Sequence, residues 1–140
     1  MQAITPYLNF NGNAAEALDF YAKALNGQIV HKQTFGETQA DFPSPETHKD
    51  KIMHALFQAG DLRFMVSDCA PGAAPVTNGS NISLALNFSD EASIVQVFEA
   101  MTEGGIITMP LQDTFWGAKF GMLTDPFGIN WMLNYDKPKS

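Results

Sequence analysis

The sequence predicts an α+β fold in which a strand–helix–three-strand unit, βαβββ, occurs twice along 140 residues. Three observations lead to this fold class. Apolar and polar residues alternate in eight short segments, apolar residues recur at three-and-four spacing in two longer ones, and the second half of the chain repeats the pattern of the first. We therefore expect a single domain, 1–140, in which a linker at 69–80 joins two modules at about 1–68 and 81–137.

The first module is expected to begin with a strand at 4–10 and to continue into a helix. Asn13 is a favourable N-cap residue, and Glu16 follows at the spacing of the reciprocal capping box. At the other end, Asn26-Gly27 can adopt the left-handed conformation that closes a helix. The helix should therefore lie between these two signals.

Three more strands complete the first module, at 28–35, 52–58 and 62–67. The polar stretch 36–50 contains two prolines and is expected to be a long loop, because proline cannot donate to a sheet ladder. The last two strands are separated by Ala59-Gly60-Asp61, a glycine-containing connection typical of a β-hairpin.

The second module repeats this order. A strand at 82–88 precedes a helix that Ser89 or Asp90 can cap and that Gly104-Gly105 closes. The remaining strands are expected at 106–111, 118–124 and 129–135. The last two are joined by Asp125-Pro-Phe-Gly128, in which the proline sets φ for a turn and the glycine can take positive φ.

An internal duplication explains the repetition. An offset of 77 residues relates Asn13 to Asp90 and Gly27 to Gly104, so the helix and its flanks repeat together. In the first strand the offset becomes 78, which pairs Leu8 with Leu86 and implies one extra residue near Asn11.

The alternation in the strands predicts an open sheet face in each module. Leu8 and Phe10 are expected to face the helix, which leaves Tyr7 and Asn9 on the open, concave side. Such polar groups suit a small-molecule pocket, and the alternative is that they simply face solvent. The candidate ligand-binding residues are Tyr7, Asn9, Arg63, Asp68, Ser83, Phe115, Trp116, Lys119, Asn130 and Met132.

The aromatic pair Phe115-Trp116 is the preferred functional candidate, because exposed rings can stack on a planar ligand or hold a cation. The alternatives are that the pair closes a sheet edge or lies in a dimer interface. Lys119 and Arg63 can meet an anionic ligand, although Lys119 can equally be an exposed strand residue. Asp68 ends a strand, where it either caps a turn or faces the cavity.

Composition excludes some partners. Fifteen acidic and eight basic residues give a net charge of −7, so the chain repels nucleic acid and anionic membranes. The single cysteine, Cys69, cannot form an internal disulfide, and the sequence shows neither a leader nor a long apolar span. These features predict a cytoplasmic protein. Cys69 also lacks an adjacent base or cation, which argues against a nucleophile.

Several motifs carry a family resemblance. They are Thr5-Pro-Tyr-Leu8, Leu18-Asp-Phe-Tyr21, Met65-Val-Ser-Asp68, Thr114-Phe-Trp-Gly117, Phe120-Gly121, Asp125-Pro-Phe-Gly128 and Trp131-Met132. With the duplicated βαβββ unit, they make the chain resemble the vicinal oxygen chelate superfamily of glyoxalases, bleomycin resistance proteins and extradiol dioxygenases, and within it the PhnB-like branch. The resemblance implies a curved, half-barrel mixed sheet around a cavity, and a homodimer.

The resemblance also bears on metal binding. Metal-dependent relatives carry His or Glu on the first and last strands of each module, and here those positions fall on Thr5 or Pro6, Met65, Ser83 and Met132. None is a good ligand for Zn²⁺, Ni²⁺ or Fe²⁺, so we expect no metal or other cofactor. A methyltransferase label sometimes attached to the branch finds no support, because no glycine-rich nucleotide turn follows the first strand.

The functional expectation is therefore a small-molecule-binding protein without the usual metal site. The alternative is a divalent-metal-dependent lyase, isomerase or dioxygenase with unconventional ligands, for which His54 and Asp68 are the candidates. A third possibility is a scaffold that binds no ligand.

Overall fold

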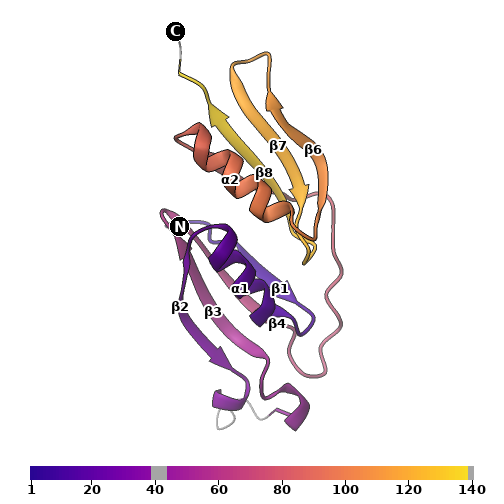
Figure 1. Ribbon diagram of the computed structural model, residues 1–140. Coiled ribbons are helices and arrows are strands. Elements are labelled where there is room, and N and C mark those ends of the chain that lie inside the picture. Colours follow the sequence, from indigo (N-terminus) through magenta and orange to yellow (C-terminus); the bar gives the residue numbers. More distant parts are fainter. Residues whose placement is uncertain (39–43, 139–140) are drawn as a thin grey trace. The chain divides into compact units, whose positions relative to one another are not determined.

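A computed structural model describes residues 1–38 and 44–138 of the chain, so the centre of the long loop at 36–50 lies outside the described residues. The chain divides into two compact units, Met1–Thr77 and Asn78–Ser140. Each unit is one βαβββ module, as the sequence predicted (Figure 1). The fold is α+β, with two open, mixed four-stranded sheets and one helix packed on each.

The first unit contains strand β1 (Tyr7–Phe10), helix α1 (Ala14–Ala24) and strands β2 (Gln28–Thr34), β3 (Ile52–Ala59) and β4 (Leu62–Asp68). Two short 3₁₀ turns, Gly36–Thr38 and Glu46–His48, lie between β2 and β3. The sheet order is β1-β4-β3-β2, in which β1 and β4 are parallel and the other pairs are antiparallel. We call this sheet A.

Helix α1 covers one face of sheet A (Figure 1). Its Tyr21 is fully buried and meets Phe64 edge to face, with ring centroids 5.4 Å apart. Phe64 in turn stacks on Phe57 at 4.7 Å. These aromatic contacts between helix and sheet form the centre of the first core.

The start of α1 differs from the sequence prediction. Asn13 occupies the N-cap position, but its side chain makes no capping hydrogen bond, so the predicted capping box with Glu16 is wrong. The backbone N–H groups of Gly12 and Ala14 instead donate to Oδ1 of Asp68, at 2.8 and 3.0 Å. A carboxylate from the end of β4 therefore does what a local cap would have done. The helix end is as predicted, with Asn26 at φ 57°.

The second unit contains β5 (Leu84–Phe88), α2 (Glu91–Thr102), β6 (Ile106–Asp113), β7 (Ala118–Thr124) and β8 (Asn130–Asp136). Its sheet, which we call sheet B, has the order β5-β8-β7-β6, with β5 and β8 parallel. The topology is therefore the same as that of sheet A. Strand β5 begins later than predicted, so Ser83 precedes the strand.

Two aspartates fix local structure in the second unit as the sequence indicated. Asp90 is the N-cap of α2, and its carboxylate accepts the Ser93 backbone N–H at 2.8 Å. Asp125 is buried and accepts the backbone N–H groups of Phe127 and Ile129 across the turn. Its second oxygen accepts the indole N–H of Trp131 at 2.8 Å. The Asp-Pro-Phe-Gly turn therefore also anchors the largest side chain of the second core.

No helix in the described part of the chain is long and apolar enough to cross a membrane. The predicted linker is tied to the first unit over part of its length, because Asn11 exchanges two hydrogen bonds with the backbone of Val76, at 2.7 and 2.8 Å.

Candidate functional site

The open face of sheet A carries the side chains that alternation placed there. Leu8 and Phe10 are buried under α1, whereas Tyr7 and Asn9 are exposed on the opposite face. The register sets Tyr7 beside Met65 and Asn9 beside Ser67. Arg63 lies two positions before Met65 on β4 and is also exposed.

Four side chains on the open face of sheet A form a contiguous group. His54 on β3 points its Nε2 atom at Met65 Sδ, 3.2 Å away. The His54 ring is also close to Tyr7 and to His31 on β2, with centroid distances of 6.1 and 6.0 Å. The sheet thus brings together an aromatic ring, a thioether and two imidazoles that are distant in sequence.

The open face of sheet B has a different character. The register aligns Met109, Met122 and Met132 across β6, β7 and β8, and Ala85 of β5 completes the row. We call these three side chains the methionine row. Phe120 lies on the same face as Met122, because the two residues are two positions apart on β7.

The Phe115-Trp116 pair lies in the turn between β6 and β7. Phe115 is 97% exposed and Trp116 is 59% exposed. Their rings meet edge to face with centroids 5.0 Å apart, and the Trp116 ring reaches Phe120 at 6.3 Å. Since both rings are exposed, neither closes the edge of sheet B. Trp116 extends the apolar surface of the methionine row through Phe120.

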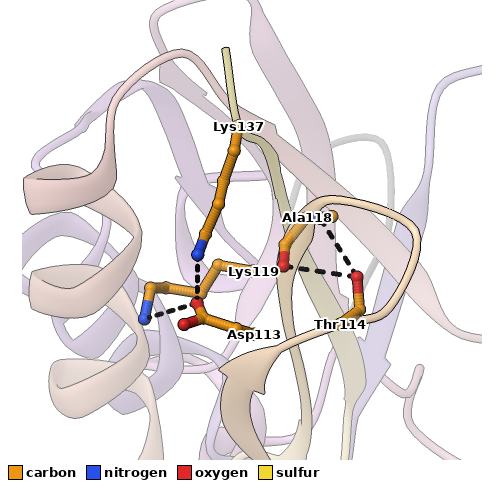
Figure 2. Close-up of polar contacts among 5 residues, drawn as sticks. All are labelled: Asp113, Thr114, Ala118, Lys119 and Lys137. Carbon is orange, nitrogen blue, oxygen red and sulfur yellow. Dashed lines mark hydrogen bonds and ion pairs between the residues drawn. The ribbon is translucent and has the colours of Figure 1, made fainter. Parts of the chain in front are cut away.

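The structure separates Lys119 from this surface. The strand register places Lys119 beside Tyr135 and Asp113, on the side of sheet B that faces α2. Its ammonium group lies 3.3 Å from the Asp113 carboxylate, and that of Lys137 lies 2.7 Å from the same oxygen (Figure 2).

This ion cluster stabilises the base of the β6–β7 turn. Hydrogen bonds from Lys137 and then Lys119 lower the pKa of Asp113, and the Asp113 hydrogen bond raises the pKa of Lys137. Next to the cluster, the Thr114 hydroxyl bonds both the N–H and the C=O of Ala118 (Figure 2). The turn that presents Phe115 and Trp116 is thus held by the ion cluster on the α2 side of sheet B and by the hydrogen bonds between Thr114 and Ala118.

Two further candidates have structural partners. Asp68 is 4% exposed and lies beside Phe10, on the helix side of sheet A. Its second oxygen accepts the Ile52 backbone N–H at 2.8 Å, so three amides occupy the carboxylate. Asp68 and His54, the two candidates of the metal-dependent alternative, lie on opposite faces of sheet A and so do not share one site, and the alternative itself stays a prediction.

Asn130 also has a structural role. Its amide group donates to the carbonyl oxygens of Gly79 and Ile82, at 3.0 and 3.4 Å, and accepts the Thr124 hydroxyl at 2.9 Å. It therefore joins the segment before β5 to strands β7 and β8. Ser83 lies within that exposed segment rather than on the sheet.

Of the methionine row, sequence reasoning singled out Met132 but missed Met109 and Met122, and it also missed Phe120 and His31 as open-face residues. Alternation along 118–124 could have placed Phe120 and Met122 on the open face, because Leu123 is a clear core residue beside them. Aligning Met109 with Met122 needed the strand register, which two irregularities in β6 shift. Among residues 1–38 and 44–138, no group of three or more His, Cys, Asp or Glu side chains forms a cluster suited to a metal ion.

A duplicated βαβββ unit, with one helix-covered and one open sheet face in each copy, defines the structural class of this protein. The family model for the glyoxalase/bleomycin resistance protein/dioxygenase superfamily matches residues 4–133. The chain therefore belongs to this superfamily.

Individual relatives agree with the assignment. The chain is 31% identical to the protein YjdN of Escherichia coli, over 96% of this chain and 95% of that protein. It is 41% identical to protein PA1353 of Pseudomonas aeruginosa, whose crystal structure superposes with a TM-score of 0.84 and covers 99% of this chain and 100% of that one. A PhnB protein from Bacillus cereus, described as a putative 3-demethylubiquinone-9 3-methyltransferase, is 30% identical over 96% of this chain and 99% of that one, with a TM-score of 0.76.

Proposed function

We propose that this chain binds a small, planar, largely apolar molecule on the open face of sheet B. The observation that carries the proposal is the continuity of Trp116, Phe120 and the methionine row across three strands. Aromatic faces stack on planar ligands, and thioethers adapt their shape to apolar surfaces of many outlines. A surface of this composition favours binding over acid–base chemistry.

Membership of the superfamily is compatible with this proposal but does not by itself distinguish a binding protein from an enzyme. Its description joins enzymes, the glyoxalases and dioxygenases, with the bleomycin resistance proteins. A shared fold does not decide between these activities, because activity depends on the side chains of the site. The methyltransferase description belongs to the Bacillus cereus protein, and we propose no methyl transfer for this chain.

The two tryptophans give the proposal a direct test. Trp116 is largely exposed, whereas Trp131 is fully buried and bonded to Asp125, so a ligand on sheet B should quench only the Trp116 fluorescence. Titration with planar heteroaromatic compounds should find ligands that quench the protein and also raise its unfolding temperature. Trp116→Ala should lower the affinity of the protein for such a ligand by roughly tenfold, which corresponds to the loss of one good stacking contact.

Phe115→Ala tests the other member of the predicted aromatic pair. It removes an exposed ring from the same turn, but Phe115 has its ring contact with Trp116 and none with Phe120 among the described residues. We expect the affinity of the Phe115→Ala protein for the ligand to stay within about threefold of that of the unmodified protein. A ligand whose affinity is the same in the original protein and in Trp116→Ala would show that the site lies elsewhere. Tyr7, Asn9 and Arg63 lie on the open face of sheet A and stay separate predictions, which single alanine variants test by thermal unfolding against the same set of compounds.

A further inference from the structure

We propose that His31, His54 and Met65 on the open face of sheet A form a binding site for a soft monovalent metal ion, Cu(I) or Ag(I). The three residues come from β2, β3 and β4, which are neighbours in the sheet. This site is separate from the one proposed on sheet B, and neither proposal depends on the other.

The donor atoms are already at metal-bridging distances. His54 Nε2 lies 3.2 Å from Met65 Sδ. With the lengths known for Zn²⁺ as a guide, about 2.0 Å to an imidazole nitrogen and about 2.3 Å to sulfur, two such donors on one ion lie roughly 3.2–3.6 Å apart. One ion can therefore join these two atoms with only a small rotation of either side chain.

His31 supplies the third donor. The His31 and His54 ring centroids are 6.0 Å apart. Two imidazoles bound to one ion through nitrogens at about 2.0 Å have centroids separated by roughly 5–6.3 Å, depending on the angle at the metal. His31 is exposed, so an ion can approach from solvent and the ring can turn toward it.

The sheet register explains why these three residues meet. His31 and Met65 each lie directly beside Leu56 on β3, and His54 is two positions from Leu56 on the same strand. His54 is therefore the diagonal neighbour of both other donors, a separation that long side chains can span. The apolar side chain of Leu56 lies between His31 and Met65 in the sheet.

The donor set selects the kind of ion. A thioether and two imidazoles carry no negative charge when the histidines are neutral, so they offer little to offset a divalent charge. Thioether sulfur is a soft ligand that favours Cu(I), whereas Mg²⁺ and Ca²⁺ require oxygen. The net charge of −7 on the whole chain attracts a cation without specifying it.

The test uses silver nitrate in chloride-free buffer, because Ag(I) is a redox-inert probe of the same soft character. All proteins carry Cys69→Ser, since the partly exposed thiol of Cys69 would itself bind Ag(I). Calorimetric titration should show one ion bound per chain. In NMR spectra, the ring signals of His31 and His54 should shift while those of His48, which packs on Phe35, stay in place.

Three conservative variants decide the assignment. Met65→Leu keeps the volume and removes the sulfur, and we expect it to weaken Ag(I) binding by about tenfold or more. Met53→Leu is the control, because it removes the methionine next to His54 in sequence and should leave affinity unchanged. His54→Gln should weaken binding as Met65→Leu does, and the thermal unfolding of each variant shows that it is folded.

Three results would overturn the proposal. One is the absence of Ag(I) binding in the Cys69→Ser protein. Another is binding that survives Met65→Leu but is lost in Met122→Leu, which would assign the ion to the methionine row. The third is an equal shift of the His31 and His54 ring signals by Zn²⁺ at the same concentration, because it would remove the preference for a soft monovalent ion.

Discussion

Asp68 is the residue on which the first unit depends most directly. Its buried carboxylate accepts the backbone N–H groups of Gly12 and Ala14 at the start of α1 and of Ile52 at the start of β3. One side chain at the end of β4 thus fixes the positions of two other elements. Because donors that lose a buried acceptor have no immediate replacement, the contribution of such a residue exceeds that of a surface cap.

Replacing Asp68 by alanine should therefore destabilise the protein by about 2–3 kcal/mol, through the unsatisfied amides of Ala14 and Ile52. Urea unfolding followed by far-UV circular dichroism measures the change. Asn13→Ala is the control, because Asn13 occupies the N-cap position without a side-chain hydrogen bond and its loss should be nearly neutral. If the two variants are equally destabilised, the capping role assigned to Asp68 is wrong.

Sequence alone could not assign this role. The pattern Asn13 to Glu16 is a valid local capping signal, and local signals are the only ones that spacing reveals. Asp68 reaches α1 from 54 residues away, as counted to Ala14, and only the parallel pairing of β1 with β4 brings them together. By contrast, Asp90 and Ser93 are three residues apart, and that cap was predictable.

At the scale of elements, the Asp90 cap makes the stability of α2 dependent on pH. Hydrogen bonds from Ser93, first from its backbone N–H and then from its hydroxyl, lower the pKa of Asp90 from the ordinary value of 3.8. A pKa that is lower in the folded state means that the folded protein favours the charged carboxylate. The contribution is therefore complete above pH 3.8 and is lost as the pH falls through the lowered pKa.

We expect Asp90→Ala to lower the unfolding temperature at pH 7 by a few degrees, as N-cap removal does in other helices. The difference between the two proteins should shrink below pH 3.8, where the wild-type carboxylate takes up its proton. Thermal scans at pH 7, 4 and 3 would measure it. A difference that stays constant across this range would show that the cap acts through geometry rather than through charge.

The elements also show the limits of prediction from pattern. Alternation correctly gave which of Tyr7, Leu8, Asn9 and Phe10 are buried, because a two-residue period is local. It could not give the row formed by Met109, Met122 and Met132, because irregularities on either side of Met109 change the pairing. Alternation also could not predict whether Lys119 and Phe115 lie on the same face of the sheet, since the turn between β6 and β7 interrupts the pattern.

At the scale of the whole molecule, duplication has produced two units with one topology and different chemistry. All three histidines lie in the first unit and both tryptophans lie in the second. The repeated features are the core positions and helix ends, such as Leu8 with Leu86 and Gly27 with Gly104. The open faces, which pack against no helix of their own unit, have diverged in side-chain chemistry.

The edge of sheet B provides a test of self-association, which the family resemblance implied. Strand β6 lies at the end of the sheet order, and its first half exposes Ile106, Ile107 and Met109 at 66, 50 and 36% without a charged residue among them. Proteins usually protect such edges with charges or cover them with another chain. The corresponding edge of sheet A is less apolar, because β2 exposes Val30 among Gln28, His31 and Lys32.

We therefore expect a dimer that forms through β6. Sedimentation velocity at about 50 µM should give twice the mass of one chain, because pairing two β6 edges removes their apolar side chains from water. Ile106→Glu should shift the protein toward the monomer, because a carboxylate buried in an apolar interface loses its hydration. Val30→Glu places the same charge on the edge of sheet A and should leave the mass unchanged. If Val30→Glu dissociates the dimer while Ile106→Glu does not, the interface lies on β2. If the unmodified protein is a monomer at every concentration, the exposed apolar residues of β6 do not mediate self-association.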